Sequence, residues 1–389
     1  MIGIVFWASV ALVAYTYAGY PLIVTLAATV AGRDRAYPKA TPKVTLVIAA
    51  YNEEKAIGPK LDEALTLDYP RELLHIVVAA DGSDDGTASI VTGYGDRGVE
   101  LVHCPERRGK MAAINRAMQW ARGEIVLFSD ANNRLRPNAL AEILRPFSDP
   151  SVGAVTGRKT VAGGNGLGFS ESAYWRYESH LRRMETRLGC TVGVNGEIFA
   201  MRRDLFVAPP DGVINDDQWL AAEVIRNGYR VVFRPEAVSE EPVSALAAEE
   251  VERRSRMVAG QYQAFSGLSR LPWRRPLVLW MLVSHKLLRP LVPFGMIGAL
   301  GSSIAAAVAA SPAEGIGGLG QPWGLAALLA QAGFYGVAAI GRSLPGRLGK
   351  VAYVPRFLVD SNLAALHGLW RHLRGTQAAA WRRAPRSGR

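Results

Sequence analysis

The sequence predicts an α/β domain with a mainly parallel sheet, flanked at both ends by helices that cross a membrane or lie on it. Three observations carry this prediction. Short apolar runs alternate with helical patterns through residues 43–238, and long segments near both ends have no charge. The charge is also split: residues 253–389 hold 18 of the 45 Lys and Arg residues but two of the 34 acidic residues, a net charge of +16, whereas residues 1–252 carry −5. A uniformly basic nucleic-acid-binding protein would not show this split.

The first predicted element is a retained transmembrane helix over residues 1–32. This stretch contains no charged residue, and about 20 apolar residues are enough to cross a bilayer. A secretory signal peptide is the alternative, but it would have a basic start and a shorter apolar run. Four basic residues follow within residues 33–43. The positive-inside rule therefore places the N-terminus outside and the next domain in the cytosol.

Residues 43–260 form the predicted cytosolic domain. Its apolar runs read as strands and the stretches between them as helices, which is typical of a parallel sheet covered on both faces. Ligands of such sheets bind beyond the carboxyl ends of the strands. The predicted strands are 44–50, 74–79, 99–102 and 125–128, and the predicted helices are 53–67, 86–95 and 110–121.

Polar clusters follow the predicted strands. The first strand runs into Tyr51-Asn52-Glu53 and the second into Asp81-Gly-Ser-Asp-Asp85. Acids at these places can contact ribose hydroxyls and base edges, or they only cap a turn. Lys110 follows a glycine at a predicted helix start. It would present a positive charge and amide donors to a phosphate, unless it belongs to a solvated basic turn.

Three further clusters complete the domain. Asp130 directly follows a buried strand, and Asn132 comes two residues later. The pair is suited to Mg²⁺ or Mn²⁺ bridging a diphosphate, with a simple helix cap as the alternative. The glycine-bearing loop 193–196 could shape a sugar or acceptor pocket. Asp216 and Asp217 begin a predicted helix, where they satisfy its dipole or supply a general base.

The C-terminal third is predicted to return to the membrane. Two uncharged stretches within residues 290–341 read as transmembrane helices, with a buried helical hairpin as the alternative. Residues 261–289 are basic and Trp-rich, as expected of an interfacial amphipathic segment. Residues 342–389 read as an interfacial helix and a basic cytosolic tail, because Arg356 and Asp360 argue against a further span at 351–370.

Taken in this order, the clusters resemble glycosyltransferase family 2, inverting enzymes with the GT-A nucleotide-sugar fold. The flanking helices look like those of the subgroup that includes hyaluronan, chitin, cellulose and poly-N-acetylglucosamine synthases, and residues 373–382 look like their C-terminal tails. The matching elements lie within residues 43–260. They are Ala50-Tyr-Asn-Glu-Glu, Asp81-Gly-Ser-Asp-Asp-Gly-Thr, Arg108-Gly-Lys, Asp130-Ala-Asn, the Asn195-Gly196 loop and Asn215-Asp-Asp.

The resemblance implies a role for each matched residue. Asp217 stands at the position of the catalytic base, with Asp216 beside it, and Asp130 and Asn132 occupy the Asp-x-Asp positions that bind Mg²⁺ or Mn²⁺. Acceptor contacts would come from the Asn195-Gly196 loop. The residues implied to bind the nucleotide are Ala50, Tyr51, Asn52, Glu53, Asp81, Lys110 and Asp130.

The sequence departs from the family pattern at two places. Asn132 replaces the second aspartate of the metal motif and removes one charge. The acceptor motif Gln/Arg-x-x-Arg-Trp becomes Arg253-Arg-Ser-Arg256-Met257, and Met257 offers an apolar contact without an aromatic face. This argues against processive polymerisation rather than against glycosyl transfer. Alternatively, these arginines form a basic helix face at lipid head groups.

These observations predict a multi-pass enzyme of the cell membrane with a cytoplasmic catalytic domain. Its donor would be a nucleotide sugar, with a UDP-sugar favoured, and its acceptor a polysaccharide or a lipid-linked molecule; membrane lipids are expected partners and nucleic acid is not. A non-catalytic membrane scaffold or nucleotide sensor that retains the fold is the alternative, suggested by Asn132 and Met257. A transporter fits poorly, because the predicted spans contain no buried ionisable group.

Overall fold

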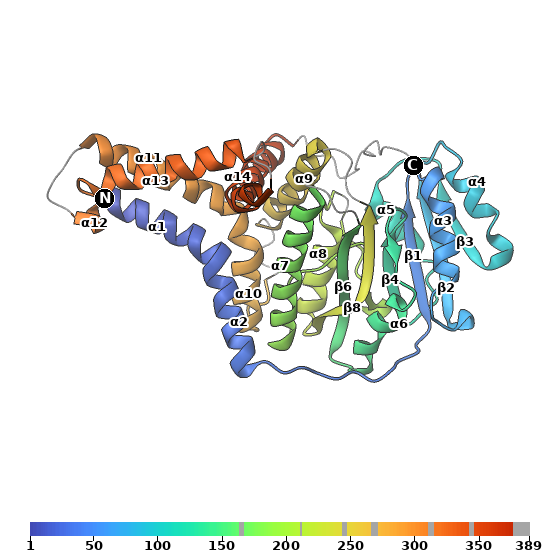
Figure 1. Cartoon of the computed structure of the whole chain (residues 1–389). Helices are drawn as coiled ribbons and strands as arrows, with labels where there is room; N and C mark the ends of the chain where they lie inside the picture. The colour runs from blue at the N-terminus through green and yellow to red at the C-terminus, as the bar shows by residue number, and fades with distance from the viewer. Residues whose placement is uncertain are drawn as a thin grey trace. The chain divides into compact units, whose positions relative to one another are not determined.

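The computed structural model of the chain forms two compact units (Figure 1). The first comprises Met1–Ile23, Ala248–Phe265 and Leu282–Thr376, and the second comprises Val24–Ala247, Ser266–Met281 and Gln377–Arg389. The predicted basic tail, residues 376–389, lies outside the described residues. The structure describes residues 1–162, 167–210, 212–242, 247–265, 271–309, 315–341 and 346–375.

A sheet with the strand order β3-β2-β1-β4-β7-β6-β8-β5 forms the centre of the second unit (Figure 1). Strands β1 to β4 are parallel to one another. Every residue of β1 is buried, as expected for a continuous apolar run in a sheet covered on both faces. The strands are β1 Val44–Ala50, β2 Leu74–Asp81, β3 Val99–Cys104, β4 Ile125–Asp130, β5 Arg134–Leu135, β6 Val152–Ala162, β7 Phe199–Arg202 and β8 Arg230–Pro242.

The sheet is mixed beyond β4. Strand β7 is antiparallel to both β4 and β6, whereas β8 is parallel to β6 and antiparallel to the short β5. The predicted α/β class and the parallel arrangement of the first four strands are therefore confirmed. The antiparallel insertion was not predicted, because an apolar run of four residues carries no sign of its direction.

Helices cover both faces of the parallel half of the sheet. The chain moves outward from β1 to β3 through α3 and α4 and then returns to β4 through α5. Since such crossovers are right-handed, α3 and α4 share one face and α5 lies on the other. The helices between the strands are α3 Glu54–Leu65, α4 Thr87–Thr92, α5 Lys110–Met118, α6 Ala139–Leu144, α7 Leu167–Arg187 and α8 Asp216–Arg226.

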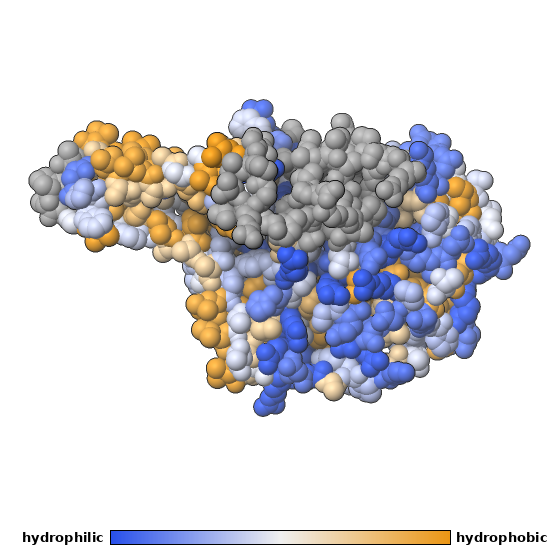
Figure 2. All heavy atoms as spheres, in the orientation of Figure 1, coloured by the Kyte–Doolittle hydropathy of each residue, from blue (hydrophilic) through white to orange (hydrophobic). Residues whose placement is uncertain are grey.

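The first unit is helical. Among the described residues, three continuous helical stretches are long and apolar enough to span a membrane: Ile2–Ala31, Pro276–Ala309 and Trp323–Ile340. Apolar side chains such as Ile4 and Leu329 are exposed on them, and Figure 2 shows this apolar surface in orange. Exposed apolar patches of this kind require a membrane or a partner. The helices that lie wholly or almost wholly in this unit are α1 Ile2–Ala14, α9 Ala247–Phe265, α11 Val292–Ala309, α12 Gly315–Gly318, α13 Trp323–Ile340 and α14 Gly346–Leu373, whereas most of α2 Tyr20–Ala31 and α10 Pro276–Leu282 belongs to the second unit.

Both segments predicted to be interfacial contain helices. The stretch that begins at Pro276 is continuous with α11, so part of segment 261–289 belongs to the same long helix as the second candidate span. The other segment contains α14, a helix of 28 residues with Pro355 inside it. Residues 342–345, at the start of that segment, lie outside the described residues.

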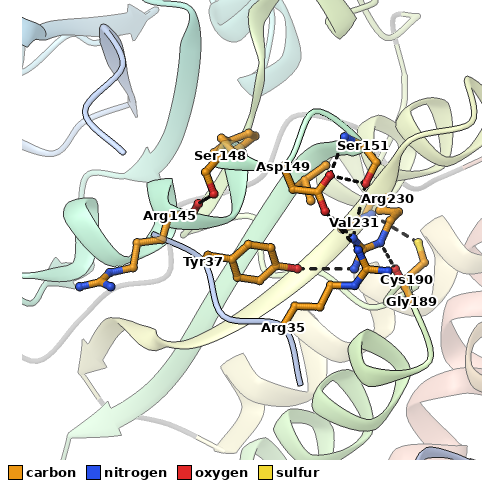
Figure 3. A network of polar contacts seen from close by, with 12 residues as sticks. Arg35, Tyr37, Arg145, Ser148, Asp149, Ser151, Gly189, Cys190, Arg230 and Val231 are labelled. Carbon is orange, nitrogen blue, oxygen red and sulfur yellow. Dashed lines mark hydrogen bonds and ion pairs between the residues drawn. The ribbon is translucent and has the colours of Figure 1, made fainter. Parts of the chain in front are cut away.

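A polar network ties the start of β8 to the turn before β6 (Figure 3). The Arg230 guanidinium donates to Asp149 Oδ2 at 3.0 Å and to the Gly189 carbonyl at 2.5 Å, and Arg35 Nη1 donates to the same Asp149 oxygen at 3.3 Å. Hydrogen bonds from Ser151, opposed in part by burial and reinforced by both arginines, lower the pKa of Asp149 below its usual value.

The two arginines of this network should differ in their effect on stability. The Arg230 side chain is 10% exposed, whereas the Arg35 side chain is 48% exposed. We expect Arg230→Met to lower the free energy of unfolding by about 2–3 kcal/mol, because it removes the hydrogen bonds of a buried guanidinium to the Asp149 carboxylate and the Gly189 carbonyl. Arg35→Met, the matched control, should cost less than about 1 kcal/mol. Denaturant unfolding of the purified protein measures both, and equal losses would contradict this assignment.

Candidate active site

The residues predicted to bind a nucleotide meet at one edge of the sheet. Registers between β1 and its neighbours pair Ala50 with Ala80 and Ala49 with Asp130, so the carboxyl ends of β1, β2 and β4 lie together. A shallow, open pocket lies at this edge. Its lining includes four residues predicted to bind the nucleotide, namely Ala50, Tyr51, Asp81 and Lys110. The other lining residues, which were not assigned to the nucleotide site, are Ala49, Arg107, Gly109 and Ala113.

Asp81 shapes one wall of this pocket. Its Oδ2 accepts hydrogen bonds from the backbone amides of Arg108 at 2.9 Å and Gly109 at 2.6 Å, and its Oδ1 accepts one from Arg116 Nη2 at 2.6 Å. The carboxylate, 4% exposed, therefore holds the turn that leads into α5. Gly109 adopts φ +98° in this turn, a conformation that favours glycine.

A glycine after β2 lets this turn approach the strand. Gly82 has φ +66°, and a Cβ at this position would lie 2.5 Å from Arg107 Cβ. The close approach brings the Arg107 guanidinium over the Tyr51 ring, 3.7 Å from its centroid. Tyr51 and Arg107 thus form a planar pair at the mouth of the pocket. Sequence reasoning missed Arg107, although the neighbouring glycines were visible signals of a tight approach.

Asn52 and Glu53 join the loops after β1 and β2. The Asn52 side chain donates to Asp84 Oδ1 at 2.6 Å and accepts from the Asp84 amide at 3.0 Å. The Glu53 amide donates to the buried Thr87 hydroxyl at 2.8 Å. These hydrogen bonds hold Asn52 and Glu53 in the loops that border the pocket. Their predicted contact with a nucleotide stays a prediction.

The centre of the site is one ammonium group among carboxylates. Lys110 Nζ lies 2.8 Å from Asp130 Oδ1 and 3.6 Å from Asp216 Oδ2. Burial alone would lower the pKa of Lys110, but the charges of Asp130, Asp216 and Asp217 and the hydrogen bond to Asp130 outweigh it and raise the pKa above its usual value. The end of β4 and the starts of α5 and α8 thus bring together four residues that were predicted separately.

The predicted acceptor loop packs against Asp217. A Cβ at Gly196 would lie 3.2 Å from the Cβ and Oδ2 atoms of Asp217, so only glycine leaves that carboxylate undisturbed. Asn195 fixes the loop to β6, because its backbone amide donates to Thr156 Oγ1 at 2.9 Å and its side-chain amide donates to the Gly157 carbonyl at 2.8 Å. Asn195 is buried, which gives it a positioning role in this loop.

A layer of buried polar residues supports the turn after β4. Asn133 donates to the Glu197 carbonyl at 2.9 Å, and its own carbonyl accepts from Lys60 Nζ at 2.9 Å. Glu197 in turn pairs with Lys159 at 2.8 Å, and Lys159 also contacts Glu241. None of these residues was predicted. Their spacing in the sequence offers no motif, and they became visible only once the strands had been brought together.

The donor set around Asp130 fits a divalent cation that also binds substrate. Among the described residues, no group of three or more His, Cys, Asp or Glu side chains forms a complete metal cage. Mg²⁺ is commonly held by one or two carboxylates together with substrate phosphates and water. Asp130 supplies a carboxylate and the partly exposed Asn132 can add an amide oxygen, so a bound diphosphate would complete the coordination.

The remaining predicted acceptor residues lie in the other unit. Arg253, Arg256 and Met257 belong to α9, which is part of the first unit, and Met257 is exposed. The side chain of Arg253 lies outside the described part of the structure. Asp217 belongs to the second unit.

Comparison with known proteins identifies relatives of both the fold and the sequence. Residues 42–260 match the model of a family described as "Glycosyltransferase like family 2". The solved mannosyltransferase PcManGT from Pyrobaculum calidifontis, in complex with GDP-Man and Mn2+, is 26% identical with a TM-score of 0.71, and the alignment covers 96% of this chain and 99% of that one.

Two curated relatives are similar over part of their length. An N-acetylglucosaminyltransferase of Rhizobium sp. (strain N33) is 24% identical over 249 residues, 59% of this chain and 55% of the relative. A poly-beta-1,6-N-acetyl-D-glucosamine synthase of Staphylococcus aureus (strain COL) is 26% identical over 202 residues, 50% of this chain and 48% of the relative. The chain thus spans about half the length of the curated relatives it matches.

A substitution of Asp81 tests whether the pocket binds the nucleotide. We expect Asp81→Ala to raise the Kd for UDP or GDP at least tenfold, about 1.4 kcal/mol, because the amides of Arg108 and Gly109 lose the acceptor that shapes the wall. Asp96→Ala removes an exposed carboxylate that does not line the pocket and should change the Kd less than about twofold. Isothermal titration calorimetry compares the two, and an unchanged Kd in Asp81→Ala would place the nucleotide elsewhere.

Proposed function

Because the chain belongs to the glycosyltransferase-like family 2, whose model it matches over residues 42–260, we propose that it is a membrane-bound inverting enzyme that transfers a sugar from a nucleotide-sugar donor to a polysaccharide or lipid-linked acceptor. The observation that supports this most strongly is the convergence of Lys110 with Asp130, Asp216 and Asp217 beside the pocket. This arrangement offers a cation for a diphosphate and a carboxylate for an acceptor hydroxyl.

The donor nucleotide would occupy the pocket at the sheet edge. The planar pair of Tyr51 and Arg107 offers a surface for a base, because aromatic rings and guanidinium planes both stack on bases. Lys110 and the amides at the start of α5 would face the diphosphate. A UDP-sugar remains the favoured donor, and GDP-Man is a second candidate because the similar mannosyltransferase was solved with it.

Asp217 would act as the general base. As the acceptor oxygen attacks the anomeric carbon, the hydroxyl proton passes to the Asp217 carboxylate, the new C–O bond forms, and the bond to the diphosphate oxygen breaks. Attack from the side opposite the leaving group inverts the configuration. Gly196 holds the loop against this carboxylate without a clash, and the neighbouring Lys110 favours its charged form.

A divalent cation, Mg²⁺ or Mn²⁺, would be held by Asp130 with Asn132 and would offset negative charge on the departing diphosphate. The Mn2+ in the similar mannosyltransferase supports this proposal. Because Asn132 carries no charge, Asp130 would contribute most of the protein's attraction for the cation. Lys110 adds a fixed positive charge at the same phosphates.

The chain would be a multi-pass protein of the cell membrane with its catalytic domain in the cytoplasm. Three helical stretches can span a bilayer, and the basic residues after the first of them, within residues 33–43, favour the cytoplasmic side. We retain residues 43–260 as the catalytic domain. The basic C-terminal third would contact anionic lipid head groups, each cation contributing about 1 kcal/mol near the surface.

Release of nucleoside diphosphate tests this function. The purified protein, incubated with a panel that includes UDP-N-acetylglucosamine and GDP-mannose, should release nucleoside diphosphate from at least one donor in the presence of native membranes. Chelation of divalent cations should abolish release, and Mg²⁺ or Mn²⁺ should restore it. Nucleotide binding without release from any donor would instead favour the non-catalytic sensor.

Asp217→Asn should separate chemistry from binding. The change removes the base but keeps the shape, so we expect kcat to fall about 10²–10⁴-fold, while the Kd for nucleoside diphosphate changes less than about threefold. Asp204→Asn is the matched control, because the same change is made at an exposed position of the same unit and should leave kcat unaltered. Full activity in Asp217→Asn would remove the base assignment.

A further inference from the structure

The ammonium group of Lys110 contacts two carboxylates that belong to different elements. Its Nζ atom is 2.8 Å from Asp130 Oδ1, at the end of β4, and 3.6 Å from Asp216 Oδ2, at the start of α8. The side chains of Lys110, Asp130 and Asp216 are 18%, 23% and 17% exposed, so solvent and small ions can reach them. An accessible cation that is held by two carboxylates marks a place where another cation can bind.

The metal motif lacks one carboxylate, because Asn132 stands two residues after Asp130. An amide oxygen carries no charge, and the affinity of oxygen-ligand sites depends on the number of charged ligands. Asp216 is a second carboxylate in contact with the cation that Asp130 holds. It can therefore supply, from α8, the charge that position 132 does not provide.

Electrostatic repulsion links the metal to the diphosphate. Asp217 follows Asp216 at the start of α8, and together with Asp130 these carboxylates would repel a diphosphate. A divalent cation offsets that repulsion. In the free protein, however, the cation must compete with the Lys110 ammonium for Asp130 Oδ1. We therefore expect the metal to bind the free protein weakly.

Lys110 can leave the carboxylates because its side chain also lines the nucleotide pocket. A lysine ammonium is carried on a flexible four-carbon stem, and it binds phosphate as a point charge. Lys110 is the first residue of α5, where backbone amides also favour an anion. A diphosphate in the pocket thus offers the ammonium a partner in exchange for the two carboxylates.

We propose that the divalent cation binds to both Asp130 and Asp216, and that the Lys110 ammonium occupies this place in the free protein. When a diphosphate binds, the ammonium moves to the phosphates and the divalent cation replaces it at the carboxylates. Asp216 then joins Asp130 and Asn132 as a metal ligand. That the diphosphate belongs to a sugar donor rests on the proposed function, whereas the competition between Lys110 and the metal does not.

Binding of Mn²⁺ to the full-length protein without nucleotide tests the competition. Electron paramagnetic resonance measures free Mn²⁺, whose signal falls as the ion binds. Lys110→Met removes the competing charge and keeps a side chain of similar length. We expect it to bind Mn²⁺ about tenfold or more tightly than the wild type, because like charges repel. Lys43→Met, the matched control at an exposed position before β1, should change the Kd less than about twofold.

A second substitution tests Asp216 as a metal ligand. Adding Asp216→Asn to the Lys110→Met protein should weaken Mn²⁺ binding about tenfold or more, because a charged ligand is lost. Adding Asp204→Asn instead, the same change at an exposed carboxylate, should weaken it less than about twofold. If Lys110→Met fails to fold, Lys110→Gln keeps a hydrogen-bond donor for Asp130 and should bind Mn²⁺ about fivefold more tightly than the wild type.

Calorimetry with UDP and GDP tests the exchange. Mn²⁺ should lower the Kd of the nucleotide about tenfold in the wild type, and less than about threefold in Asp216→Asn. Equal Mn²⁺ affinity in the wild type and the folded Lys110 variants, or no effect of Asp216→Asn, would overturn the proposal. Absence of nucleotide binding would contradict the proposed function, while the Mn²⁺ titrations still decide whether Lys110 occupies the cation site.

Discussion

The ammonium group of Lys110 lies between the carboxylate at the end of β4 and the carboxylates at the start of α8. Without it, the carboxylates of Asp130, Asp216 and Asp217 would repel one another. Much of the second unit serves to place this group. The sheet registers position Asp130, the turn held by Asp81 starts α5 at Lys110, and the Gly196 loop holds Asp217.

A second set of buried polar groups supports the site. Asn133 and Lys60 fix the turn that follows Asp130, and the Lys159–Glu197 pair fixes the loop that presses on Asp217. Burial lowers the pKa of Lys60, although Glu63 and other carboxylates oppose the shift. Charges aimed in advance at the place where charge develops need no reorganisation during reaction. In the proposed mechanism, this preorganisation accounts for the charged groups that are buried beneath the site.

Much of the fold could be predicted from local sequence, and less of the site. The continuous apolar run of β1 coincides with the predicted strand, because a strand that is buried on both faces consists almost entirely of apolar residues. Lys110 was predicted to lie near phosphates. Its contacts with Asp130 and Asp216 could not be predicted, because these carboxylates lie in distant segments of the sequence. Arg107 and Asn133 carry no motif. The π-helical turns Tyr15–Gly19 and Val283–Leu287 also leave no periodic signal in the apolar sequence that contains them.

A structure of the protein with a nucleoside diphosphate and Mn²⁺, with the metal located by its anomalous scattering, tests the central claim most directly. The account predicts the base beside Tyr51 and Arg107, the diphosphate within reach of Lys110 Nζ, and Mn²⁺ bound by Asp130 and diphosphate oxygens. A nucleotide outside this pocket, or Mn²⁺ bound away from Asp130, would contradict it.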